Sequence, residues 1–156
     1  MKGDDDIIIH LNRLLSNELV AVNQYFLHSK IFKNWGLKRL HKIEYQECMD
    51  ELHHSDLYID RILFLEGLPV LRSFDELSIK KGIEDVLRMD LSLEYNSVNN
   101  LKNSIKYADS VQDYISKDTM IRILQDEEQH INFLETELNL LVSMGMHNYI
   151  QSQLEK

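Results

Sequence analysis

The chain contains very few of the residues that interrupt regular structure. Its 156 residues include one proline and five glycines. Because these two residues are the strongest helix breakers, their scarcity favours long helices. There is also a single cysteine, Cys48, which excludes an internal disulfide and is typical of proteins from a reducing compartment. We expect Cys48 to be a buried, structural thiol.

Long apolar runs are absent as well. No stretch approaches the ~20 apolar residues that cross a bilayer, and the acidic start MKGDDDIII lacks the features of a signal peptide. We therefore expect a cytoplasmic protein with no membrane partner. The formal net charge of −9 argues against nucleic acid as a partner. The length fits a single domain over residues 1–156, which can bury a core without disulfides.

The few breakers divide the chain into helices. We expect an all-α fold with helices over residues 5–34, 38–66, 83–107 and 117–144, and a short C-terminal helix over residues 147–153. Short links join the first helix to the second and the third to the fourth, so each pair is an antiparallel hairpin. The link between the pairs has about 15 residues, which predicts a four-helix bundle with one long crossover.

Each predicted helix has one face that is apolar toward its ends and acidic near its middle. The central acids are Glu18, Glu51, Glu94 and Glu127. Burying a carboxylate is costly unless it is neutralised or paired, and no Lys or Arg lies near these glutamates on the same faces. A bound metal would compensate the four charges. Without metal the acids should repel, so we expect Glu51→Gln to leave the metal-free bundle at least as stable.

Two histidines support the metal interpretation. Glu51 and His54 are three residues apart, as are Glu127 and His130, so each pair shares one helix face. Both pairs lie in an Asp-Glu-x-x-His pattern, which begins at Asp50 and Asp126. Imidazole and carboxylate together suit iron, manganese or zinc.

The spacing of these residues repeats within the chain. Glu18 precedes Glu51 by 33 residues, and Glu94 precedes Glu127 by the same number, so the two halves are related by a shift of 76 residues. Each half therefore supplies one lone glutamate and one Glu-x-x-His pair. This is the ligand set of di-iron and di-manganese carboxylate bundles.

Several longer stretches resemble the bacterioferritin family, and the similarity is ungapped over essentially the whole chain. They are MKGDDDIIIHLNRLLSNELVAVNQYFLHSKIFKNWGLKRLH, YIDRILFLEGLP, NLKNSIKYADSVQDYISKDTMIRILQDEEQHINFLETEL and MGMHNYIQSQ. The resemblance implies a ferritin-like bundle in shells of 24 subunits, built from two-fold dimers. It also implies ferroxidase activity on Fe(II) with dioxygen or hydrogen peroxide, storage of ferric mineral, and a ferredoxin-type electron donor for iron release.

The resemblance also assigns roles to the six predicted ligands, which would hold two iron ions per subunit. Glu18 and His54 would bind one iron, Glu94 and His130 the other, and Glu51 and Glu127 would bridge them. Tyr25, Asp90 and Tyr58 are candidates for contacts with these ligands or for electron transfer, and the alternative for the tyrosines is an ordinary core position. Phe133 stands where the family often has tryptophan.

Haem b is a further cofactor that the resemblance implies. The family holds it between paired subunits through one methionine from each, and this chain has Leu52 at that position. Leucine has no sulfur, and Met49 is one turn away and rotated about 60° from it. We therefore expect bis-methionine haem to be lost.

Two further sites follow from the resemblance. The inner-surface iron site of the family has histidine where this chain has Gln46, so we expect that site to be weakened although Asp50 remains. Residues that would line pores of the shell, or otherwise lie on a solvated surface, are Asn17, Asn34, Glu66, Asn148 and Gln151.

Two other functions also suit a four-helix bundle. One is a di-iron oxidase or peroxidase that stores no mineral and forms a smaller assembly. The other is a purely structural, cytokine-like bundle, which the buried acids argue against. A second apolar stripe on the second helix, distinct from the one with Glu51, favours an oligomer. Its members are Tyr45, Cys48, Leu52, Ile59 and Leu63.

Overall fold

The computed structural model describes residues 1–71 and 81–154, and every regular element in this part of the chain is a helix. The elements are α1 (Asp5–Asn34), α2 (Lys38–Phe64), α3 (Ile83–Ser110), α4 (Tyr114–Met144) and α5 (Met146–Ser152). The predicted all-α bundle with a short C-terminal helix is confirmed. The helix ends differ by a few residues, since α2 ends two residues earlier and α4 begins three residues earlier than expected.

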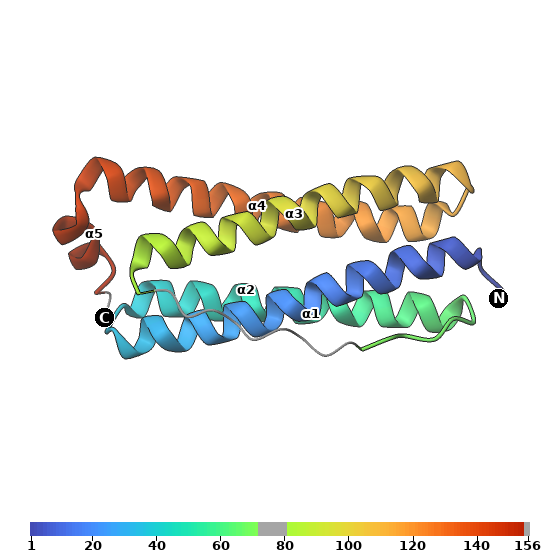
Figure 1. The fold of residues 1–156 in the computed structure, drawn as a ribbon, viewed down its shortest axis with the longest axis horizontal. Helices are drawn as coiled ribbons and strands as arrows, with labels where there is room; N and C mark the ends of the chain where they lie inside the picture. The colour runs from blue at the N-terminus through green and yellow to red at the C-terminus, as the bar shows by residue number, and fades with distance from the viewer. Residues whose placement is uncertain (72–80, 155–156) are drawn as a thin grey trace.

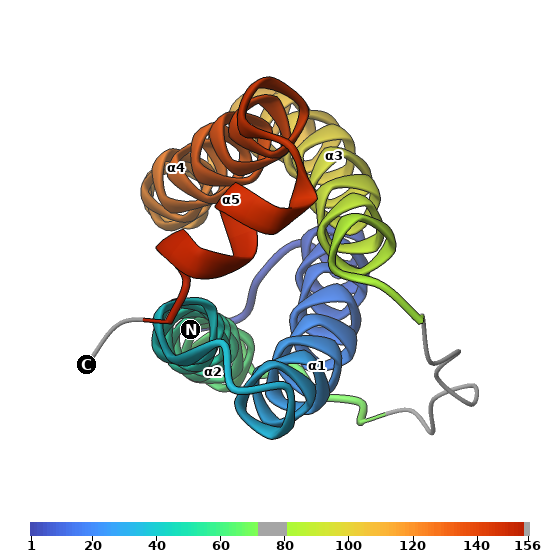
Figure 2. The ribbon, with the colours of Figure 1, turned by 90° about the vertical axis from the view of Figure 1, so that its left-hand side faces the viewer.

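The helices form two antiparallel hairpins that pack against each other (Figure 1). One hairpin is α1 with α2 and the other is α3 with α4. The end of α2 and the start of α3 lie at opposite ends of the bundle, as a long crossover requires, although residues 72–80 of that crossover lie outside the described residues. The short α5 lies across one end of the bundle (Figure 2).

Side-chain caps mark where two of the long helices begin. Asp4 precedes α1, and its carboxylate accepts hydrogen bonds from the backbone N–H groups of Asp6 and Ile7, at 2.9 and 3.1 Å. Asp113 caps α4 in the same way through the N–H of Ser116. Arg61 of α2 also donates to Asp113, at 2.9 Å, which fixes the turn between α3 and α4 to the other hairpin.

Several helices end in a left-handed residue. Gly36 has a φ of +80° after α1, and the next N–H, of Leu37, donates to the carbonyl of Phe32 at 2.9 Å. This is the bonding of a Schellman motif. Glu66 and Gln112 take the same place after α2 and α3, with φ values of 63° and 60°, although neither is glycine.

The apolar core is divided into two large clusters, one toward each end of the bundle. The first includes Leu11, Leu15, Ile62 and Leu101, and the second includes Phe32, Leu40, Leu87 and Leu134. Polar side chains therefore occupy the middle of the bundle. Cys48 is buried, as expected. Within residues 1–71 and 81–154 no helix combines the length and apolar character that a bilayer crossing requires.

Candidate metal centre

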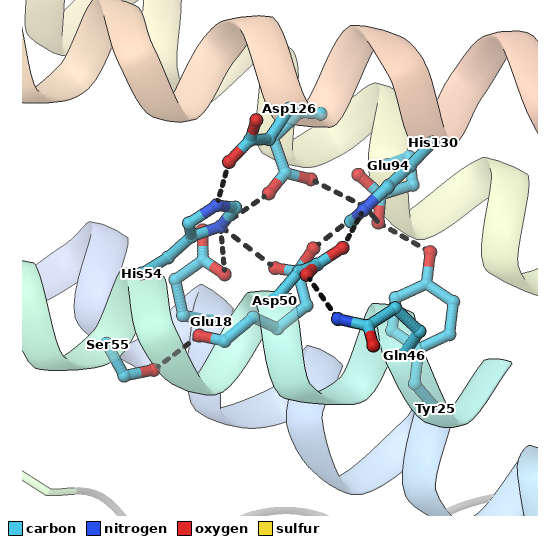
Figure 3. Close-up of polar contacts among 11 residues, drawn as sticks. Glu18, Tyr25, Gln46, Asp50, His54, Ser55, Glu94, Asp126 and His130 are labelled. Carbon is cyan, nitrogen blue, oxygen red and sulfur yellow. Dashed lines mark hydrogen bonds and ion pairs between the residues drawn. The ribbon is translucent and has the colours of Figure 1, made fainter. Parts of the chain in front are cut away.

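All six predicted ligands meet inside the bundle, and Figure 3 labels four of them, Glu18, His54, Glu94 and His130. The four long helices each contribute, and every one of the six side chains is at most 6% exposed. Their donor atoms form two groups, and the atoms of each group lie within 4.8 Å of one another. The groups are Glu18, Glu51, His54 and Glu127, and Glu51, Glu94, Glu127 and His130.

The two imidazoles point the same ring nitrogen inward. Nδ1 of His54 lies 3.1 Å from Glu127, 3.5 Å from Glu18 and 3.8 Å from Glu51. Nδ1 of His130 lies 3.0 Å from Glu51, 3.5 Å from Glu94 and 4.0 Å from Glu127. Equivalent distances in the two halves agree within 0.2 Å. The repeat in the sequence is thus a local two-fold symmetry of the site.

The same distances divide the four glutamates into two kinds. Glu51 and Glu127 each lie within 4.0 Å of both imidazoles. Glu18 pairs with His54 alone, and Glu94 with His130 alone. The arrangement therefore offers two binding positions, each with one terminal carboxylate and one imidazole, and two carboxylates placed between them.

Two aspartates hold the outer nitrogens of the imidazoles. Nε2 of His54 lies 2.7 Å from Oδ2 of Asp126, and Nε2 of His130 lies 3.2 Å from Oδ2 of Asp50. Such carboxylate–histidine pairs fix the ring orientation and keep the other nitrogen free for a metal. Sequence reasoning missed these contacts, although the shared Asp-Glu-x-x-His pattern already contained both aspartates.

Many inward-facing atoms of the site make no hydrogen bond within the described residues. They are Oε2 of Glu18, Oε1 of Glu51, Oε2 of Glu94, both carboxylate oxygens of Glu127, and Nδ1 of His54 and His130. Buried polar atoms are normally satisfied, so this concentration of free oxygen and nitrogen donors fits metal ions of the kind that imidazole and carboxylate prefer.

Protonation balances part of the charge in the metal-free site. Burial favours neutral imidazole, but contacts with Glu127, Glu18 and Glu51 raise the pKa of His54 above its ordinary value of 6.5. The pKa of His130 is raised in the same way, by Asp50, Glu51 and Glu94. Burial and the neighbouring Glu51 also raise the pKa of Glu18 well above its ordinary value of 4.5. Protons on these groups therefore balance part of the carboxylate charge when no metal is bound.

Two tyrosines lie beside the six residues. The hydroxyl of Tyr25 donates to Oε1 of Glu94 at 2.5 Å, which links α1 to a lone glutamate of the other hairpin. The hydroxyl of Tyr58 is buried without a hydrogen-bond partner among the described residues, and burial and Glu18 raise its pKa. Asp90 differs from the sequence-based expectation, because it bonds to Gln24 and His28 rather than to one of the six.

Comparison with known proteins agrees with this geometry. The Ferritin-like domain family model matches residues 8–144. A bacterioferritin from Brucella melitensis biotype 1 is 44% identical over 151 residues, which cover 97% of this chain and 94% of the relative. The chain belongs to the bacterioferritin family. Another relative, a bacterial ferritin from Synechocystis sp., is 41% identical over 155 residues and covers 99% of both chains.

The position at which bacterioferritins are expected to hold haem is aliphatic here. Leu52 is 45% exposed on α2 and carries no atom that can ligate iron. It lies in a surface groove with Met49 and His53. Leu52 therefore does not fit a haem whose iron is bound by sulfur.

The remaining predicted sites lie on the surface of the single chain. Gln46 donates to Oδ1 of Asp50 at 3.0 Å, so this aspartate binds both Gln46 and His130. Of the expected pore residues, Asn17 is half-buried and the other four are exposed. Glu66 pairs with the N-terminal amine at 3.1 Å. The pore roles depend on an assembly and stay predictions.

Proposed function

We propose that this chain is an iron-storage ferroxidase that oxidises Fe(II) at the six-residue centre. The observation that carries the proposal is the pair of inward Nδ1 atoms, each surrounded by three carboxylates and each held from behind by an aspartate. Membership of the bacterioferritin family supports iron as the metal.

The ligand roles follow from which glutamate lies near which imidazole. One Fe(II) is bound by Glu18 and His54, and the other by Glu94 and His130. Glu51 and Glu127 bridge the two ions, since each lies within 4.0 Å of both imidazoles. Two neighbouring ions supply two electrons together. Dioxygen takes these electrons and two protons to give hydrogen peroxide, or hydrogen peroxide takes them to give two water molecules.

Residues around the centre support this reaction. Asp126 and Asp50 orient the two imidazoles, and the two end clusters of the core keep the site away from bulk water. Binding of Fe(II) displaces the protons of His54, His130 and Glu18, because a ligand must be deprotonated to bind a metal. Tyr25, in contact with Glu94, holds that carboxylate in place and is a candidate electron donor.

Storage of the oxidised iron requires a shell, and an exposed apolar face on α2 supports one. Tyr45, Met49, Leu52, Leu63 and Phe64 are all large and between 41% and 55% exposed in the single chain. Such a face is normally covered by a partner. We propose two-fold dimers that assemble into a 24-subunit shell in the cytoplasm, with a ferredoxin-type donor that reduces the mineral for release. A smaller, non-storing di-iron oxidase or peroxidase is the second candidate.

Anaerobic addition of Fe(II) followed by oxygen tests the proposal. We expect rapid oxidation of about two Fe(II) per chain, and loss of the fast phase in Glu18→Ala and in Glu94→Ala, because each variant removes a terminal ligand from one iron. Asn99→Ala, on the exposed side of α3, is the control and should keep the fast phase. Unchanged fast oxidation in both ligand variants would contradict the assignment.

Particle size separates the two candidates. A 24-subunit shell of this 18.5 kDa chain has a mass of about 440 kDa before mineral is added. A dimer of the same chain would support the non-storing oxidase instead.

A further inference from the structure

A second buried polar cluster lies outside the six-residue centre. It consists of His28 on α1, Glu44 on α2 and Asp90 on α3, all at most 2% exposed. A ring nitrogen of His28 and one carboxylate oxygen from each acid lie within 4.8 Å of one another. None of the three belongs to the ligand set of the di-iron centre.

The acids of this cluster have free oxygen atoms. Neither carboxylate oxygen of Glu44 has a hydrogen-bond partner among the described residues, and the same is true of Oδ2 of Asp90. Oδ1 of Asp90 lies 2.8 Å from Nδ1 of His28 and accepts a hydrogen bond from Nε2 of Gln24 at 2.9 Å. Two acids thus face each other deep in the bundle with three unpaired oxygens, which is costly unless a proton or a cation lies between them.

The internal repeat supplies a comparison within the same molecule. A shift of 76 residues relates Glu44 to Met120, Asp90 to Leu14 and His28 to Ser104. Met120 and Leu14 are buried in the apolar core. The bundle therefore has two apolar side chains and a serine at this location in one half, and two acids and an imidazole in the other.

A requirement of the fold would apply to both halves, so the one-sided cluster needs a separate explanation. We propose that His28, Glu44 and Asp90 form a third metal site that binds a divalent first-row transition-metal ion. One imidazole and two carboxylates suit Fe(II), Mn(II), Co(II) or Zn(II) better than the all-oxygen cations Ca²⁺ and Mg²⁺. Three protein ligands also leave a coordination position open for water or exchange.

Gln24 connects the cluster to the surface. Its side chain contacts Asp90 on one side and lines a surface groove between α1 and α3 on the other. The other polar residues of this groove are Asp85, Arg88, Ser92 and Asn96. Gln24 is therefore the side chain between the third site and this surface groove.

Co(II) is a suitable probe because it is a divalent ion that suits imidazole and carboxylate ligands and can be located by anomalous scattering. We expect crystals of the purified, assembled protein soaked in Co(II) to show an anomalous peak between His28, Glu44 and Asp90, in addition to peaks at the di-iron centre. The Glu44→Gln variant should bind one Co(II) per chain fewer than the unchanged protein, as measured by equilibrium dialysis. Its crystals should lack this peak and keep those of the di-iron centre.

Two further variants separate this proposal from the ferroxidase assignment. Glu18→Ala should weaken the peaks of the di-iron centre and keep the third one. Glu44→Met places the residue of the other half at this position, so it should fold and lose the third peak. The proposal is overturned if the unchanged protein has no anomalous peak in the cluster, which would mean that Glu44 and Asp90 share a proton instead. It is also overturned if the peak persists in both Glu44 variants.

Discussion

Glu18 and Glu51 are both buried in the metal centre, but they contact different numbers of imidazoles. Glu18 pairs with His54 alone, whereas Glu51 pairs with His54 and His130. Burial opposes ionisation of both. Contacts with Glu18, His130 and His54 nevertheless lower the pKa of Glu51, while the pKa of Glu18 is raised. Glu51 therefore lies beside two imidazoles that can carry its counter-charge, whereas Glu18 lies beside one.

The contacts of Glu51 with two imidazoles lead to a different prediction for Glu51→Gln from the one based on repulsion alone. In the metal-free protein we expect Glu51→Gln to lower the free energy of unfolding by about 2 kcal/mol, because it removes charge-assisted contacts with two imidazoles. Glu18→Gln should lower it less, since Glu18 pairs with one imidazole and burial favours its neutral form. Chemical denaturation of the two metal-free variants measures the difference, and equal losses would contradict the unequal roles.

The stability of the metal-free protein should also decrease as the pH rises. His54, His130 and Glu18 have pKa values above their ordinary 6.5 and 4.5, so the folded chain binds more protons than the unfolded one as pH rises past these values. Stability then falls with rising pH. Glu51 opposes this effect only in acid, where its lowered pKa is approached.

We therefore expect the midpoint temperature of thermal unfolding of metal-free protein to decrease as the pH is raised from about 6 to about 9. Protein loaded with Zn(II) should show a smaller fall, because the metal has already displaced the protons. Calorimetry at several pH values provides the measurement. A midpoint that rises with pH in the metal-free protein would show that these groups do not dominate.

At the scale of the helices, the sequence predicted what depends on local pattern. Glycine and proline mark the helix ends, and the spacing of three and four residues places Glu51 beside His54 and Glu127 beside His130. The contacts of Asp50 with His130 and of Asp126 with His54 were not predictable in this way. They join α2 to α4, so they depend on how two hairpins dock rather than on the period of either helix.

The cluster of His28, Glu44 and Asp90 was not predicted from the sequence, for a related reason. Glu44 and Asp90 lie on the inward faces of α2 and α3, whereas His28 and Gln24 lie on α1. Which side chains of these three helices meet depends on how the two hairpins dock, and the pattern of one helix does not contain this. A comparison of the two halves at the 76-residue shift was the available signal, since Glu44 corresponds to Met120.

A turn between helices offers a test of backbone strain. Gln112 has a φ of 60° between α3 and α4, a conformation that favours glycine. We expect Gln112→Gly to raise the free energy of unfolding by about 0.5–1 kcal/mol. The control is Gln125→Gly, at an exposed position within α4, which should lower it by about 1 kcal/mol. Denaturant unfolding of both variants measures the effect, and destabilisation by both would argue against strain at Gln112.

At the scale of the whole molecule, the exposed face of α2 bears on haem. Leu52 and Met49 both lie in its surface groove. We expect protein produced with ample haem to lack a bis-thioether absorption spectrum, and Leu52→Met to gain one at one haem per two chains, because it restores a sulfur at the family's position. Ferroxidase kinetics should not change, since the six-residue centre is on another face of α2.

Met49→Leu in the unchanged background is the matched control and should have no effect on the spectrum. Stoichiometric bis-thioether haem in the unchanged protein, lost in Met49→Leu, would show instead that Met49 has replaced the missing ligand.

The crossed aspartate–histidine pairs have a consequence for how such a chain could have arisen. Asp50 orients the histidine of the second hairpin, and Asp126 orients the histidine of the first. One hairpin alone therefore has no complete half of the centre, but two identical hairpins related by a two-fold axis would have both halves. The contacts suit an ancestral homodimer whose gene was duplicated and fused. The crossover then joins the two copies, and the cluster of His28, Glu44 and Asp90 is a place where the copies have since diverged.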